Sequence, residues 1–504
     1  MTHRTALCGT TAFLLATAGM AQAEITGAEV WANWQSAAAG LGQTLTPGNE
    51  TQSGDTLTIT DLQISMPMPD GSVEGSIAMV EFVDRSDGTV GITMSPSYDM
   101  TVIVDPEIGE AVNVALQVTQ EGLTMVASGG DGEVTYDFLA PSMSFGVTNL
   151  EVDGEMIELL AEGVLTDMDG KYVVTEGDTP VVTTQFTAAN MTINVDMNEP
   201  DGGDGSFAMA LAYSDLVAES AGSLMMMANP EELSMLLDKG LGTATSFTHG
   251  PATFEVNFQD APDMFALSGS AATGEFDVAL DGEQLAYAFG NTGLDISMSG
   301  SEIPLPEVAF ALGELGFALL MPSSPSETPE DFGLGITLAD LAVSDMIWSM
   351  IDAGGQLPHD PATLIFDVTG QANWLFDIFN PESMMEVEAD MPAELHALDL
   401  NSLVVAVAGA ELTGSGAFTF DNTDLETFDG MPAPTGSIDL KLVGGNGLLD
   451  SLVAMGLLPE DQAMGARMMM GLFARPGDGE DTLVSTIEVD GATGAVSANG
   501  QRLQ

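Results

Sequence analysis

Cysteine and basic residues are almost missing from this sequence. The 504 residues include one cysteine, Cys8, and eight lysines and arginines against 76 aspartates and glutamates. A single cysteine excludes an intrachain disulfide, and so few basic residues cannot assemble a patch that neutralises phosphates. We therefore expect no nucleic-acid partner, and we expect anionic membrane surfaces to be disfavoured.

Long apolar runs are also missing, because no stretch after residue 23 reaches the roughly 18 apolar residues of a membrane-spanning helix. Residues 1–23 have the pattern of a secretory signal, with an apolar core and the cleavage site Ala21-Gln22-Ala23 before Glu24. Cys8 precedes that core, whereas a lipidation cysteine would follow it. We expect a protein that is exported to a bacterial periplasm and has no transmembrane segment.

The formal net charge of −68 makes the acidic residues of the surface repel one another, and high salt weakens this repulsion by screening the charges. This predicts a marine or salt-adapted envelope and weak, nonspecific cation binding. Apolar residues make up 45% of the chain, which is enough for a substantial core and excludes a disordered acidic protein.

Motifs that would identify an enzyme or a cofactor site are absent, including nucleophile elbows, phosphate loops and dinucleotide fingerprints. Asp167-Met168-Asp169-Gly170 resembles the start of a calcium loop, but Lys171 and the missing twelfth-position glutamate exclude an EF-hand, and a hairpin turn is predicted instead. His249 and His359 each stand two residues before a proline, which favours turns over metal binding. His396 has no partner for a zinc site. We predict neither enzyme activity nor a cofactor or metal.

A helix is predicted directly after the signal. Thr26 and Glu29 have the spacing of a capping box, and Trp31 and Trp34 recur at helical spacing. The tryptophans are expected to close the open end of a sheet, with a surface aromatic patch as the alternative. From Asp55 the apolar period becomes two, with a phase slip near Asp61 that indicates a bulge. Short strands follow to about residue 185, together with one short helix predicted at residues 156–161. Asp-Gly pairs at residues 70, 87, 131, 153 and 169 indicate hairpins.

One stretch occurs twice. The strand starting at Phe207 leads through an apolar helical segment to His249-Gly-Pro-Ala-Thr, and the strand starting at Phe332 leads to His359-Asp-Pro-Ala-Thr. In both copies an Asp-Leu pair follows the phenylalanine by eight and nine residues, which indicates a duplicated strand-helix-strand unit. A looser third copy ends the chain with a helical hairpin whose second arm starts after Pro459.

These patterns divide the chain into five predicted segments. They are a signal peptide at 1–23, an N-terminal helix plus antiparallel β meander at 24–185, repeat unit 1 at 186–305, repeat unit 2 at 306–390, and repeat unit 3 with the helical hairpin at 391–504. The predicted fold is mainly β (β-rich α+β). It is an extended antiparallel sheet of repeated strand-helix-strand units with short helical hairpins packed on one face.

Methionine is abundant, with 32 residues that cluster in the predicted helices. Methionine fills irregular cores and lines adaptable apolar grooves, so both roles stay open, whereas a copper site lacks the spaced motif it needs. The predicted hydrophobic groove consists of Met225, Met226, Met227, Met235, Trp348, Met350, Met464, Met468 and Leu472.

Four stretches resemble the domain-of-unknown-function 2125 family of alphaproteobacterial exported proteins. They are Ala28 to Trp34, Gly54 to Leu57, Asp87 to Pro96, and the tail from Val489 to Gln501. The resemblance implies an envelope protein without assigned chemistry, and it transfers no functional residues.

The leading hypothesis is a noncatalytic periplasmic protein that binds or shields a hydrophobic, lipid-like ligand between the sheet and the methionine-rich helices. The alternative is a structural or protein-interaction component of the envelope that uses long sheet edges. A glycan or wall hydrolase is the third hypothesis, and it would need a cleft with two carboxylates roughly 5 to 9.5 Å apart.

Overall fold

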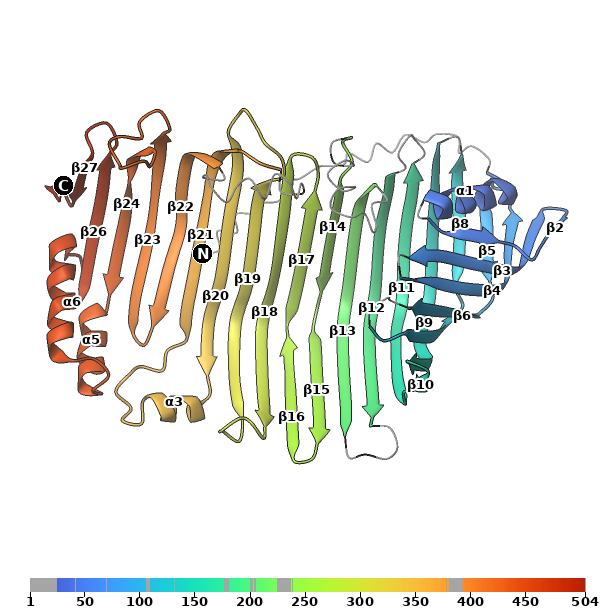
Figure 1. Ribbon diagram of the computed structural model, residues 1–504, viewed down its shortest axis with the longest axis horizontal. Helices are drawn as coiled ribbons and strands as arrows, with labels where there is room; N and C mark the ends of the chain where they lie inside the picture. Colours follow the sequence, from blue (N-terminus) through green and yellow to red (C-terminus); the bar gives the residue numbers. More distant parts are fainter. Residues whose placement is uncertain are drawn as a thin grey trace.

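The chain forms one large antiparallel β-sheet (Figure 1). The structure, a computed structural model, describes residues 25–40, 42–68, 70–105, 109–130, 132–175, 181–199, 203, 205–223, 237, 239–377, 379 and 393–503. In the part of the chain that the structure describes, the sheet has 28 strands, and 66% of the residues are strand. The predicted mainly β class is confirmed.

Helices are few and short beside the strands. In the described residues they are α1 (Gly27–Gly40), α3 (Asp345–Ile351), α5 (Gly445–Ala454) and α6 (Glu460–Phe473). The strands are β1 (Thr44–Thr46), β2 (Asn49–Ser53), β3 (Thr56–Met68), β4 (Gly71–Asp84), β5 (Val90–Met94), β6 (Ser97–Val104), β7 (Val112–Glu121), β8 (Thr124–Gly130), β9 (Glu133–Val152), β10 (Glu155–Met156), β11 (Leu159–Thr175), β12 (Val181–Asn198), β13 (Ser206–Ser223), β14 (Thr243–His249), β15 (Ala252–Asp260), β16 (Asp263–Ala271), β17 (Thr273–Leu280), β18 (Gln284–Gly300), β19 (Val308–Pro322), β20 (Glu330–Val343), β21 (Ala362–Trp374), β22 (Ala393–Val407), β23 (Ala410–Asp421), β24 (Ala433–Val443), β25 (Arg475–Pro476), β26 (Thr482–Asp490), β27 (Ala495–Ala498) and β28 (Gln501–Arg502).

The strands follow one another across the sheet as a single meander. Several long strands are divided into two pieces that lie end to end. For example, β14 and β15 both pair with β13, and β16 and β17 both pair with β18. The meander predicted for the N-terminal region therefore continues through the whole sheet, from β3 to β26.

An interruption crosses the middle of the sheet, and we call it the crease. Its members from β9 to β20 are Pro141, Asp167, Ala189, Asp215, Gly250, Ala272, Gly293, Gly313 and Asp340. Asp167, Asp215 and Asp340 have positive φ of 50°, 52° and 56°. Aspartate tolerates this left-handed conformation better than most residues. Each interruption advances the side-chain alternation by one residue, so that Tyr213 and Leu216 both contribute to one apolar cluster.

The phase slip predicted near Asp61 is confirmed, and it belongs to the same pattern. Asp61 has a φ of 52°. The pairs Thr60 with Met79 and Leu62 with Ile77 keep one register, so both strands skip a single residue there. The slip is therefore two-sided and is not the one-sided bulge that the sequence indicated.

The N-terminal helix closes the first end of the sheet. The amide of Thr26 donates to Glu29 Oε2 at 2.8 Å, and the amide of Glu29 donates to Thr26 Oγ1 at 3.4 Å, which confirms the capping box. Trp31 is 4% exposed, and the rings of Trp31 and Trp34 lie 6.1 and 5.2 Å from the ring of Phe82. The tryptophans are therefore core residues.

Two local predictions for the N-terminal region are wrong. Asp167 to Gly170 lie inside strand β11 and make no hairpin turn, because Gly170 pairs with both Phe138 and Phe186. Residues 156–161 form no helix, since β10 ends at Met156 and β11 begins at Leu159. The Asp153-Gly154 turn is confirmed, with φ of 50° and 83° between β9 and β10.

The duplicated stretches share a local conformation, because Asp215 in β13 and Asp340 in β20 both lie on the crease with positive φ. Five antiparallel steps separate the two strands, so they run in opposite directions. In the first copy the strand continues past the crease and pairs with β14, whereas β20 ends at Val343 and helix α3 follows. The division into repeat units itself stays a prediction.

The helices lie at the margins of the sheet. Figure 1 places α3 at the ends of β20 and β21, α5 and α6 beside the C-terminal edge, and α1 at the opposite end. The helical hairpin predicted after β24 is confirmed as α5 and α6. None of the helices in the described ranges has the length and apolar content needed to cross a membrane.

Candidate functional site: one apolar face of the sheet

A row of large apolar side chains crosses one face of the sheet. Directly paired residues of neighbouring strands point to the same side, so the registers define the row. We call it the central row, and its members are Phe138, Phe186, Ala218, Phe247, Phe276, Phe289, Phe317, Ile336, Phe366 and Leu403, with Gly170 between the first two. Eleven strand positions at about 4.8 Å spacing make the row roughly 48 Å long.

Aromatic contacts hold the middle of the row in place. Phe289 and Phe317 stack at 5.9 Å between ring centroids, and Tyr287 meets Phe276 edge-on at 5.4 Å. At the N-terminal end, Phe138 and Phe186 lie 6.4 Å apart across Gly170. A Cβ on Gly170 would lie 2.1 Å from the Phe138 ring, so this position has to be glycine. That close approach, and not a turn, explains the Asp169-Gly170 pair.

From β11 to β20, the face that contains the central row is apolar along the described strands and has charged side chains only at strand ends. Neighbouring rows on both sides of the crease contain aliphatic, aromatic and small residues, such as Leu211, Phe254 and Ile296. Its polar members are hydroxyl residues, Asn291 and His249, and its acids are Asp260 and Asp263, where β15 and β16 meet, and Glu330, at the start of β20. We call this surface the apolar face.

The opposite face is acidic and polar. The row next to the central row contains Asp137, Lys171, Gln185, Glu219, Ser246, Asp277 and Asp367. Lys171 Nζ lies 3.9 Å from Asp137 Oδ1, and both side chains are about half exposed, so this pair adds little stability. The two faces of one sheet thus differ sharply in polarity.

The described residues cover the apolar face only in part. The two clusters of buried residues lie around α1 and the first strands and around β9 to β14. Beyond them the members of the central row are half-buried, and Phe276 is 36% exposed. Phe258 and Phe265, on a parallel row, are 41% and 38% exposed. In the described structure, a large part of this apolar face is thus in contact with solvent.

The groove residues predicted from the sequence do not lie together on this face. Met225, Met226, Met227 and Met235 lie outside the described residues. Trp348 and Met350 belong to α3, whereas Met464, Met468 and Leu472 belong to α6. Met350 is 63% and Met468 is 72% exposed, and Figure 1 shows the two helices at different margins of the sheet. The cleavage-site residues Ala21, Ala23 and Glu24 also lie outside the described part of the chain.

The histidines take part in packing and turns. His249 Nδ1 lies 2.7 Å from the carbonyl oxygen of Gly250, and the His249 ring meets Tyr213 edge-on at 5.0 Å. His359 stacks on Trp348 at 4.3 Å. Its Nε2 lies 3.8 Å from the buried carboxylate of Asp352. Hydrogen bonds from the amides of Gln356 and Leu357 lower the pKa of Asp352, and His359 lowers it further.

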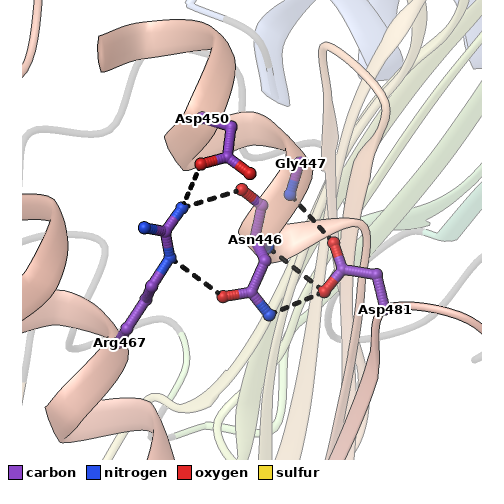
Figure 2. A network of polar contacts seen from close by, with 5 residues as sticks. All are labelled: Asn446, Gly447, Asp450, Arg467 and Asp481. Atoms are coloured by element: carbon purple, nitrogen blue, oxygen red, sulfur yellow. Dashed lines mark hydrogen bonds and ion pairs between the residues drawn. The ribbon is translucent and has the colours of Figure 1, made fainter.

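The helical hairpin is fastened to the sheet by a polar network (Figure 2). Asp481 accepts hydrogen bonds from the amide of Gly447 at 2.9 Å and from Asn446 Nδ2 at 2.8 Å, which satisfies the start of α5. Arg467 of α6 donates to Asn446 and lies 2.5 Å from Asp450. Burial raises the pKa of Asp481, but the bonds from Gly447 and Asn446 and the charge of Arg467 outweigh it and hold the pKa below its ordinary value.

Metal binding finds no support in the geometry. Within the ranges that the structure describes, no three His, Cys, Asp or Glu side chains converge on a point where an ion would sit. The acidic residues are spread along the outer face.

The fold and this site define a class of protein: a single-layer antiparallel β-sheet with one apolar and one acidic face. The chain belongs to the bacterial family described as an uncharacterized protein conserved in bacteria, DUF2125, which matches residues 218–503. The resemblance inferred from the sequence is thereby confirmed. Of the four stretches that suggested it, the tail from Val489 lies inside the matched range and the other three precede it.

Comparison with solved structures found weak overlaps with two iron transporters. The FrpB iron transporter from Neisseria meningitidis, in its apoprotein form, is 8% identical over 89% of this chain and 76% of its own, with a TM-score of 0.16. The unliganded ferric citrate transporter FecA is 7% identical over 89% of this chain and 72% of its own, with a TM-score of 0.15. Overlaps this weak carry no argument. The comparison with curated proteins found no match.

Proposed function

We propose that this chain is a noncatalytic periplasmic protein that binds and shields the acyl chains of a lipid on its apolar face. The observation that carries the proposal is the central row, in which large apolar side chains occupy nine of eleven strand positions and are only partly covered by the residues that the structure describes. Covering such a surface is favourable at roughly 25 cal/mol per Å² of apolar area removed from water.

Hydrocarbon fits this face better than a peptide does. The backbone amides and carbonyls of the central strands are used by the sheet ladder, and between β11 and β20 the charged side chains of the apolar face lie only at strand ends. An extended peptide would therefore leave its polar backbone groups unpaired, at a penalty of about 1–3 kcal/mol for each buried group. Acyl chains have no such groups. Each leaflet of a bilayer contributes about 15 Å of hydrocarbon thickness, so a row of roughly 48 Å is as long as about three acyl chains laid end to end.

A second copy of the chain is a poorer occupant. Face-to-face pairing would bring together two chains with a formal charge of −68 each. Repulsion between charges of the same sign opposes that contact, most strongly at low salt.

The edges of the sheet also favour a ligand over the alternative of a partner bound through long sheet edges. At the C-terminal end, β26 is covered by the two-residue strand β25, which contains Pro476, and by the short β27. At the other end, β1 and β2 are three and five residues long and pair with β3. Short edges of this kind discourage the addition of another strand.

Native mass spectrometry of the protein purified from bacterial cells without detergent tests the proposal. We expect a monomer with bound mass that organic extraction removes and that is identified as lipid. A bare monomer would contradict lipid binding, and a stable dimer without lipid would indicate that a second copy covers the face.

A further inference from the structure

The placement of the charged residues determines which headgroup a bound lipid would carry. Seven of the eight lysines and arginines lie in the described residues, and the four that belong to strands, Lys171, Lys441, Arg475 and Arg502, point to the outer face. Lys171 faces Asp137 on the outer side, and Lys441 alternates with the inner residues Leu440 and Leu442 in β24. Arg467 is paired with Asp450 in the helical hairpin.

Most acids lie outside this face, and Asp260, Asp263 and Glu330 lie at its margins. The acids outside it occupy the outer face and the turns, as Glu219, Asp277 and Asp367 do. Lys239 stands in the turn before β14, but the acids far outnumber it, so an anionic headgroup at a rim of the sheet would meet a negative potential. Potentials of several kT over a protein surface change local ion concentrations by about tenfold.

From this distribution we infer that the apolar face selects lipids with a zwitterionic or uncharged headgroup and disfavours anionic ones. The inference rests on the proposed function, because it assumes that acyl chains bind the face. Selection of this kind is electrostatic and long-ranged. It is therefore strong where the Debye length is about 30 Å, at 0.01 M salt, and weak where it is about 3 Å, at 1 M.

A competition experiment with the full chain tests the inference. Delipidated protein is incubated with vesicles that contain equal amounts of phosphatidylcholine and phosphatidylglycerol with identical acyl chains. The protein is then separated from the vesicles, and its lipids are quantified by mass spectrometry. At 10 mM salt we expect a five- to tenfold excess of phosphatidylcholine, roughly as a potential of about two kT predicts. At 1 M salt we expect a ratio within about twofold of one.

A matched pair of variants locates the effect. Met321 lies on the apolar face near the end of β19, where it pairs with Leu285, and the adjacent Leu320 points to the outer face. Met321→Lys places a cation beside the ligand and is expected to shift the ratio at 10 mM salt severalfold toward phosphatidylglycerol. Leu320→Lys adds the same charge on the other side of the sheet and is expected to shift it by less than twofold.

The outcomes distinguish a failure of the headgroup inference from a failure of the proposed lipid binding. Lipid uptake with phosphatidylglycerol equal to or above phosphatidylcholine at 10 mM salt would overturn the headgroup inference and leave the lipid proposal in place. An excess of phosphatidylcholine that is unchanged at 1 M salt would overturn its electrostatic cause. No uptake of either lipid would overturn the proposed function itself.

Discussion

Shortening one aromatic side chain of the central row should weaken lipid binding by an amount that the structure sets. Phe276 is 36% exposed. A phenylalanine buries roughly 200 Å², so about 70 Å² of Phe276 remains for a ligand to cover. At roughly 25 cal/mol per Å², covering that area contributes about 1.8 kcal/mol. We therefore expect Phe276→Ala to raise the lipid Kd by up to about 20-fold.

The assay is a titration of delipidated protein with a fluorescent acyl lipid. Asp277→Ala is the matched control, since Asp277 is the next residue in β17 and lies on the acidic face. It should change the Kd by less than about twofold. Phe276→Leu keeps most of the apolar area and should retain most of the affinity. Circular dichroism and thermal unfolding of each variant separate a loss of binding from a loss of folding.

Equal losses for Phe276→Ala and Asp277→Ala would refute this reasoning. A normal Kd for Phe276→Ala in a folded protein would refute it as well, because the exposed area of that ring would then make no contact with the ligand.

Three further predictions concern stability. Asp481→Ala should destabilise the α5–α6 hairpin by about 1 kcal/mol. The pKa of Asp481 in the folded protein lies below the ordinary value of 3.8, so the stabilisation by its carboxylate is present above pH 3.8 and is lost as the pH falls through the folded pKa. Thermal melts of wild type and variant should therefore differ at pH 7 and converge in acid. Asp215→Gly should be tolerated at the left-handed crease position, whereas Asp215→Val should lower the unfolding free energy by at least about 1 kcal/mol in denaturant titration. Trp31→Ala should destabilise the N-terminal end by about 3–5 kcal/mol, and hydrogen exchange should rise in β3 and β4 before it rises elsewhere.

The local structure of this chain followed well from its sequence. The capping box at Thr26, the turn at Asp153-Gly154 and the terminal helical hairpin depend on neighbouring residues, so short patterns are sufficient to predict them. The phase slip at Asp61 was visible as a change in the apolar alternation. Asp167 was misread as part of a turn because the sequence does not reveal that Gly170 faces two phenylalanine rings.

The central row could not be predicted, because it depends on the register of strands far apart in the sequence. The signal was present as alternating aromatic residues in successive strands, such as Phe247, Phe276, Phe289 and Phe317. Only the pairing places them on one line. The methionine clusters instead favoured the helices as the ligand site, but α3 and α6 lie at the margins of the sheet (Figure 1). The candidate ligand surface is therefore the sheet face itself, whereas the sequence predicted a groove between the sheet and the helices.

Photo-crosslinking from the central row tests the main claim most directly. A p-benzoylphenylalanine in place of Phe289 would lie on the apolar face, and the same group in place of Ala288 would lie on the acidic face. After irradiation in bacterial cells, intact-protein mass spectrometry should show a lipid adduct at position 289 and none at position 288. Adducts at both positions, at neither, or only to another protein would contradict lipid binding on this face.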